Sequence, residues 1–144
     1  MLKLTKRADY GLIALRHLAV SQKTSNAKEI AESYGIPLPL MSKVLQTLTR
    51  KGFLASEQGV YGGYRLARGP QTISALEVIQ SIDGPVLLTA CFTEHGQCDQ
   101  SDRCTVRQPL RKVHEGILEL LRGITILDMS EEKAREAPLY QVNP

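Results

Sequence analysis

The chain has 144 residues, enough for one domain with a hydrophobic core, and it lacks an apolar run long enough to cross a bilayer. It also lacks a charged-then-apolar signal segment at its start, so we expect a cytoplasmic protein with no membrane partner. The net charge of +3 is uneven: residues 1–69 carry 11 basic and 4 acidic side chains (+7), which favours a polyanionic partner or a solvated lysine-rich surface, and residues 70–144 carry 7 and 11 (−4).

Two helices are predicted before residue 35. Residues 5–21 place apolar side chains at three- and four-residue steps, and Thr5 is a candidate N-cap. A second, two-turn helix is predicted over residues 25–35, where either Ser25 or Asn26 is a suitable N-cap.

A third helix is predicted from Pro39 onward, because proline suits a first helical turn. Its apolar stripe consists of Met41, Val44, Leu45 and Leu48. A short helix, a turn with glycine and a second helix with a polar outer face form the helix-turn-helix pattern, whose second helix enters the major groove. Ordinary helical hairpins share this pattern. The candidate DNA-contacting residues here are Lys28, Ser42, Lys43, Gln46 and Arg50.

A β-hairpin is predicted next, with residues 53–58 and 64–68 on either side of a glycine-rich turn. A basic hairpin directly after a recognition helix is typical of a wing that lies along the DNA backbone or minor groove. A hairpin that only packs under the helices is the alternative. Gln58, Arg65 and Arg68 are the candidate DNA contacts of the hairpin. We therefore predict a mainly α fold with a small β-hairpin wing, and a winged helix-turn-helix DNA-binding region over residues 1–69.

The second half is predicted to contain a connecting helix within residues 70–87, capped by Ser74, and a long helix over residues 105–123. A C-terminal segment, residues 124–144, follows. The long helix repeats apolar side chains over more than four turns, at Val106, Leu110, Val113, Ile117, Leu120 and Leu121. An intramolecular neighbour is one way to cover this stripe, but the short remaining helices favour a second copy. A homodimer would place two recognition helices about one DNA turn apart, on a near-palindromic double-stranded operator.

All three cysteines, Cys91, Cys98 and Cys104, lie in residues 88–104, the cysteine segment, which we expect to be a loop because acidic and polar residues and a glycine lie between the thiols. An odd number of clustered thiols in a reducing compartment favours a metal, a cluster or redox chemistry over disulfides. Zinc would be satisfied by three thiolates and His95. Iron–sulfur clusters also bind thiolates, although neither common ferredoxin spacing is present.

Four features occur together in this chain: the Leu-Thr-Lys-Arg-Ala-Asp-Tyr-Gly run at residues 4–11, the Gly-Gly-Tyr-Arg-Leu wing at residues 62–66, the three cysteines and the Leu-rich helix that follows them. Together they resemble the Rrf2 family of bacterial transcriptional regulators. Members include regulators of the isc and suf operons and a nitric-oxide-sensing repressor. The resemblance implies a dimeric winged-helix protein in which Cys91, Cys98 and Cys104 hold an iron–sulfur cluster, with 2Fe-2S favoured and 4Fe-4S possible.

The fourth cluster ligand departs from the isc-type regulator. Arg107 stands where that regulator has a histidine, and the first gap between cysteines is one residue longer. Asp9 matches the helix 1 aspartate that supplies the fourth ligand from the partner subunit in the nitric-oxide sensor. His95 and His114 are alternatives, and an aspartate in a first helical turn is otherwise simply favourable at the helix dipole.

The expected function is a DNA-binding transcriptional regulator, either repressor or activator, that senses iron–sulfur, redox or nitric-oxide status. A zinc-stabilised or thiol-redox winged-helix regulator without iron is the alternative in the same class. An electron-transfer or cluster-carrier protein is the alternative in another class. No catalytic triad, phosphate loop or paired-carboxylate site is recognisable, so no enzyme is expected.

Overall fold

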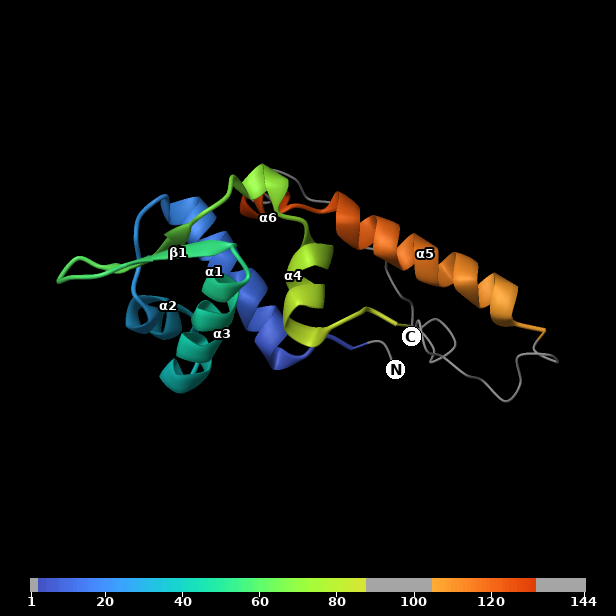
Figure 1. Ribbon diagram of the computed structural model, residues 1–144, viewed down its shortest axis with the longest axis horizontal. Helices are drawn as coiled ribbons and strands as arrows, with labels where there is room; N and C mark the ends of the chain where they lie inside the picture. Colours follow the sequence, from blue (N-terminus) through green and yellow to red (C-terminus); the bar gives the residue numbers. More distant parts are fainter. Residues whose placement is uncertain (1–2, 88–104, 132–144) are drawn as a thin grey trace.

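The computed structural model describes residues 3–87 and 105–131. Within these residues the chain is mainly helical, with one two-stranded sheet (Figure 1). The elements in chain order are α1 (Lys6–Ser21), α2 (Ala27–Tyr34), α3 (Leu38–Arg50), β1 (Leu54–Glu57), β2 (Gly63–Leu66), the 3₁₀ turn η1 (Pro70–Thr72), α4 (Ala75–Asp83), α5 (Arg107–Gly123) and α6 (Ile126–Glu131). The predicted fold class, helices with a β-hairpin wing, is confirmed.

Side chains cap the starts of α1, α2 and α4, and Thr125 caps α6 in the same way. Thr5, Asn26 and Ser74 each accept a hydrogen bond from the backbone N–H three residues further on, at 2.8 to 3.1 Å. At α4 the bond is reciprocal, because the Ser74 N–H donates to the Glu77 carboxylate at 3.2 Å. Of the two caps considered for α2, Asn26 is therefore the one used. Such caps contribute about 1 kcal/mol each, so they fix where the helices start.

The core lies between α1, α2, α3 and the base of the hairpin. The predicted α3 stripe is confirmed, since Met41, Val44, Leu45 and Leu48 are all buried. The core does not end at residue 69, because Ile73, Val78 and Ile126 are also fully buried in it. The division of the chain into functional regions therefore remains a prediction, although the body that carries the wing is completed by α4 and α6.

The hairpin is antiparallel, with Leu54 opposite Leu66 and Glu57 opposite Gly63. Its second strand is bound to the segment before α2, because the N–H of Tyr64 donates to the carbonyl of Ser25 at 2.8 Å and the reverse bond measures 3.0 Å. A Cβ added to Gly63 would lie 2.5 Å from the Ser25 carbonyl oxygen. Only glycine allows these two backbones to approach so closely, so the wing is held at a fixed angle to the helix-turn-helix.

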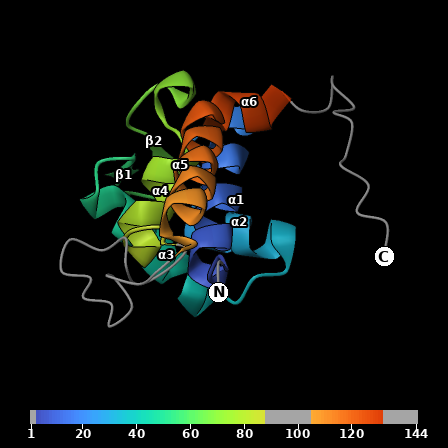
Figure 2. The ribbon, with the colours of Figure 1, turned by 90° about the vertical axis from the view of Figure 1, so that its right-hand side faces the viewer.

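The helix α5 begins two residues later than predicted, at Arg107, and packs beside α4. Figures 1 and 2 show its N-terminal end projecting away from the body formed by α1 to α4. No side chain of α5 is fully buried in the described structure. Among the described elements, α4 is therefore the main neighbour of α5.

Candidate nucleic-acid interface and cluster residues

The face of α3 opposite the core stripe is open to solvent. Lys43, Gln46 and Arg50 are exposed there, and Ser42 is half-buried beside them. Because successive exposed residues are three or four apart, they form one strip along the helix. The structure thus brings together four of the residues that the sequence predicted to contact DNA.

A groove of about 540 Å³ runs beside this strip. It is lined by Arg7, Lys43, Gln46, Thr47, Thr49, Arg50, Ser56 and Tyr64. Three of these side chains are cationic and none is acidic, so the groove has a positive potential that suits phosphate. Sequence reasoning missed Arg7, Ser56 and Tyr64 because they come from α1 and the hairpin, and no local pattern indicates that they approach α3.

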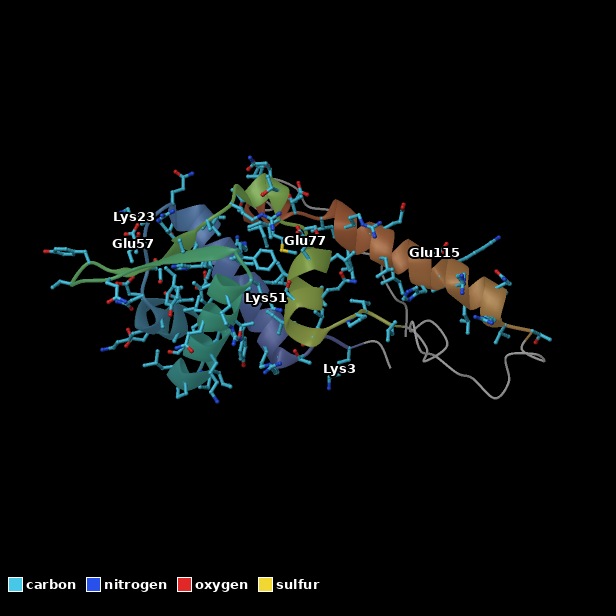
Figure 3. The ribbon with its side chains drawn as sticks, viewed as in Figure 1. Lys3, Lys23, Lys51, Glu57, Glu77 and Glu115 are labelled. Atoms are coloured by element: carbon cyan, nitrogen blue, oxygen red, sulfur yellow. The ribbon has the colours of Figure 1, made fainter. Side chains whose placement is uncertain are left out.

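The wing carries a cation on its second strand, where Arg65 lies opposite Ala55. The Arg65 Nε donates to the Glu57 carboxylate at 2.8 Å, and both side chains are about half exposed. Figure 3 shows this glutamate on the hairpin, at the end of the molecule opposite to Glu115 of α5, so the ion pair belongs to the wing alone. Gln58, Val60 and Tyr61 form an exposed tip, in which the latter two are almost completely open to solvent. Sequence reasoning included Gln58 but not the apolar pair, because only polar and basic side chains were considered as DNA contacts.

Two further predicted DNA contacts have partners within the protein. The Arg68 guanidinium donates to the Glu77 carboxylate at 3.2 Å and to the Thr72 carbonyl at 2.6 Å, and it lies 5.5 Å from the centre of the Phe53 ring. Burial raises the pKa of Glu77, but the hydrogen bonds and charge of Arg68 and the bonds from Ser74 outweigh it and lower the pKa overall. Lys28 is exposed on α2, 4.0 Å from Glu32. Contact of either residue with DNA remains a prediction.

The predicted cluster ligands are mostly outside the described residues. Cys91, His95, Cys98 and Cys104 all lie there. Asp9 is exposed in the first turn of α1, and His114 is half-buried on α5. Within residues 3–87 and 105–131, no three His, Cys, Asp or Glu side chains are grouped as metal ligands. The ligand set therefore remains a prediction.

The six predicted dimer residues divide into two groups. Leu110, Ile117 and Leu121 are half-buried, and the last two line a mainly apolar pocket of about 420 Å³ with residues of α4 and the N-terminal segment. Val106, Val113 and Leu120 are exposed, to 53, 51 and 71 %, at intervals of seven residues. The exposed three form a second apolar strip that the described residues leave uncovered.

Residues 4–132 match the sequence pattern of the Rrf2 family, described as iron-dependent transcriptional regulators. The chain belongs to the Rrf2 family. It is accordingly a transcriptional regulator with a DNA-binding winged helix, and not an enzyme. Within the described residues, no helix has both the length and the apolar character needed to span a membrane.

This Rrf2 protein is similar to relatives of known sequence and structure. It is 34 % identical over 131 residues to Protein aau3 of Rhizobium meliloti strain 1021. The aligned residues cover 89 % of this chain and 84 % of that protein. The solved structure of T. potens IscR matches with a TM-score of 0.72 and 28 % identity, over 97 % of this chain and 93 % of that one. The solved structure of CymR, the global cysteine regulator of B. subtilis, matches with a TM-score of 0.79 and 23 % identity, over 90 % and 97 %. The likeness to CymR supports the fold.

Proposed function

We propose that this protein is a homodimeric regulator that reads a near-palindromic operator through α3 and the wing. We propose further that its DNA affinity depends on an iron–sulfur cluster bound by Cys91, Cys98 and Cys104. The observation that carries the DNA-binding part is the strip of Lys43, Gln46 and Arg50 beside the cationic groove. Base edges are read by such amide and cationic side chains, and phosphates are bound by the arginines around them.

A homodimer is supported by the exposed strip on α5. Three apolar residues spaced by seven lie on one side of a helix over about four turns, which is the seam that a second helix covers. Gly116 lies beside this strip, and a Cβ added there would contact nothing within 4 Å in the described structure. A glycine in the middle of a helix lowers stability by about 1 kcal/mol relative to alanine. No contact within the described protomer requires a glycine here, whereas a closely approaching partner helix would.

Cluster binding is supported by donor chemistry. Three thiols within one short polar segment suit iron–sulfur clusters, and IscR, at 28 % identity, is a regulator of the same family. When bound, the cluster would supply redox-sensitive chemistry. Of the candidate fourth ligands, Asp9 is favoured because it is exposed at the start of α1, where a partner subunit can approach it. His95 and His114 remain alternatives.

Contacts around the end of α4 support coupling between the cysteine segment and the DNA-binding face. Asp83 ends α4 just before that segment and accepts hydrogen bonds from the N–H and the hydroxyl of Thr5, the cap of α1. Arg7, which lines the groove, donates to the Ile82 carbonyl at 3.4 Å. A shift at the end of α4 would therefore move both the start of α1 and a cation of the groove.

The test is anaerobic purification followed by visible spectroscopy and analysis of iron and sulfide. Operator binding of cluster-loaded and cluster-free protein is then measured over a salt series. We expect visible thiolate-to-iron absorption, and DNA affinity that changes with cluster occupancy and falls steeply with salt. Zinc without iron, or an affinity controlled only by thiol oxidation, would support the alternative regulator. An iron protein that binds all DNA sequences equally would support the electron-transfer alternative.

A further inference from the structure

The first turn of α3 is apolar although it faces solvent. Leu38 and Leu40 are 43 and 38 % exposed, and Pro39 between them is exposed as well. Neither leucine is among the side chains that pack against the core, which is filled by the opposite face of the same helix. Exposed apolar side chains gathered in one turn usually mark a contact surface rather than a structural need.

This turn also differs from the starts of α1, α2 and α4. Those three helices have a side-chain cap and an acidic residue in the first turn, whereas α3 has neither, and its cap position is Pro37. An acidic side chain at this place would repel a phosphate backbone. The first turn of α3 therefore has no side-chain donor or acceptor, and the side chains of Leu38, Pro39 and Leu40 present only hydrocarbon.

The apolar turn is continuous with the proposed base-reading strip. Leu38 precedes Ser42 by four residues and Leu40 precedes Lys43 by three, which places each pair on one side of the helix. In helix-turn-helix proteins the N-terminal residues of the recognition helix contact the base edges. The first turn of α3 therefore occupies the position where the edges of base pairs are read.

The major groove offers one hydrocarbon group, the 5-methyl group of thymine. We propose that Leu38 and Leu40 contact thymine methyl groups in each operator half-site and so make thymine a requirement at those positions. The polar residues Ser42, Lys43 and Gln46 then read the neighbouring bases. This inference rests on the proposed DNA-binding function and adds the chemical group that the first turn recognises.

The expected effect is the loss of one buried methyl-sized contact. Replacing thymine by uracil removes only the methyl group and leaves every hydrogen-bonding atom of the base in place. We expect the dissociation constant to rise about fourfold for each substituted thymine, because one buried methyl-sized group contributes ~0.8 kcal/mol.

The experiment starts with selection of binding sites from a randomised duplex library by the full-length protein. Each thymine of the selected site is then replaced singly by deoxyuridine, and dissociation constants are measured by fluorescence anisotropy. The same scan is run on Leu38→Ser and Leu40→Ser. The control is Val20→Ser on α1, because Val20 is 54 % exposed but lies on another helix.

We expect at least one deoxyuridine position per half-site to weaken binding by the wild type and the control. That penalty should disappear in Leu38→Ser or Leu40→Ser, while thermal unfolding should change little because neither leucine packs against the core. The inference is overturned if no deoxyuridine weakens wild-type binding, or if both leucine variants keep the full penalty. Selection that enriches no sequence would instead count against the proposed DNA-binding function itself.

Discussion

Charged residues in the exposed strip of α5 should abolish the dimer without unfolding the protomer. The change is the double variant Val113→Asp/Leu120→Asp. Both side chains are largely exposed in the protomer, at 51 and 71 %, so aspartates there remain solvated in a single chain. Ile117 is less suitable, because it lines the pocket against α4 and a charge there would disturb the protomer.

The size of the effect follows from the exposed fractions. Full burial of a valine or leucine side chain contributes roughly 1.5–3 kcal/mol, of which about half or more is still available at Val113 and Leu120. Two such side chains in each of two copies therefore contribute on the order of 4–8 kcal/mol to association. Loss of even the lower figure weakens dimerisation by about a thousandfold, and four carboxylates in the interface add a desolvation cost.

The assay is sedimentation velocity over a range of concentrations, with circular dichroism as a check of folding. Operator affinity should fall by roughly a hundredfold or more, because two linked half-site contacts become independent. The control, Gln108→Asp/Arg122→Asp, places two acids on exposed polar positions of the same helix and should remain dimeric. A Val113→Asp/Leu120→Asp protein with the dimerisation constant of the wild type would refute the assignment of α5 as the interface.

Three other changes test the wing, an ion pair and the cysteines. Gly63→Ala should lower stability by about 1–3 kcal/mol, because its Cβ would lie 2.5 Å from the Ser25 carbonyl oxygen, and an unchanged melting temperature would contradict the close approach. Glu77→Gln keeps the capping box but removes the charge facing Arg68, at a cost of about 0.3–1 kcal/mol for partly exposed groups. Because the folded-state pKa of Glu77 is lowered, this difference should be present above its ordinary value of 4.5 and disappear as the pH falls through the folded pKa, as urea melts at several pH values would show. Cys98→Ser should remove visible absorption and iron while the dimer persists, and a retained spectrum would exclude Cys98 as a ligand.

The local features of the fold could be predicted from sequence because they depend on neighbouring residues. The buried stripe of α3 follows from helical periodicity, and the starts of α1 and α4 follow from the capping preferences of Thr5 and Ser74. The hairpin follows from a glycine-rich turn between two short segments that each mix apolar and polar residues. Each of these signals lies within a few residues of the structure that it specifies.

Contacts between distant segments could not be predicted in this way. The residues before α6 pair with those before α4, since the Ala75 N–H donates to the Ile124 carbonyl at 2.8 Å and the Ile126 N–H to the Ile73 carbonyl at 2.9 Å. A six-residue helix has too few turns for its periodicity to show which partner it needs. Sequence analysis therefore indicated a C-terminal segment, but not that Ile126 completes the core.

The candidate site was predictable in kind but less so in its members. Positive charge in residues 1–69 indicated a nucleic-acid interface, and Lys43 and Arg50 do line the cationic groove. Charge alone could not show that Arg68 has partners inside the protein, because an arginine that stabilises a fold and one that binds phosphate have the same sequence signal. The cysteines lie outside the described residues, so the cluster remains a prediction from their number and spacing.

Most of the exposed large apolar side chains of the described residues lie at the two proposed contact surfaces, one for DNA and one for the second protomer. One group is at the first turn of α3 and the tip of the wing, and the other is along α5. Figure 1 shows the hairpin and α5 at opposite ends of the molecule, with the core of α1, α3, α4 and α6 between them. Since that core is complete without either group, changes in them should alter DNA binding or association while leaving the stability of the protomer almost unchanged. In the proposed dimer, a change in DNA affinity would therefore come from the relative placement of the two protomers, with no part of either core unfolded.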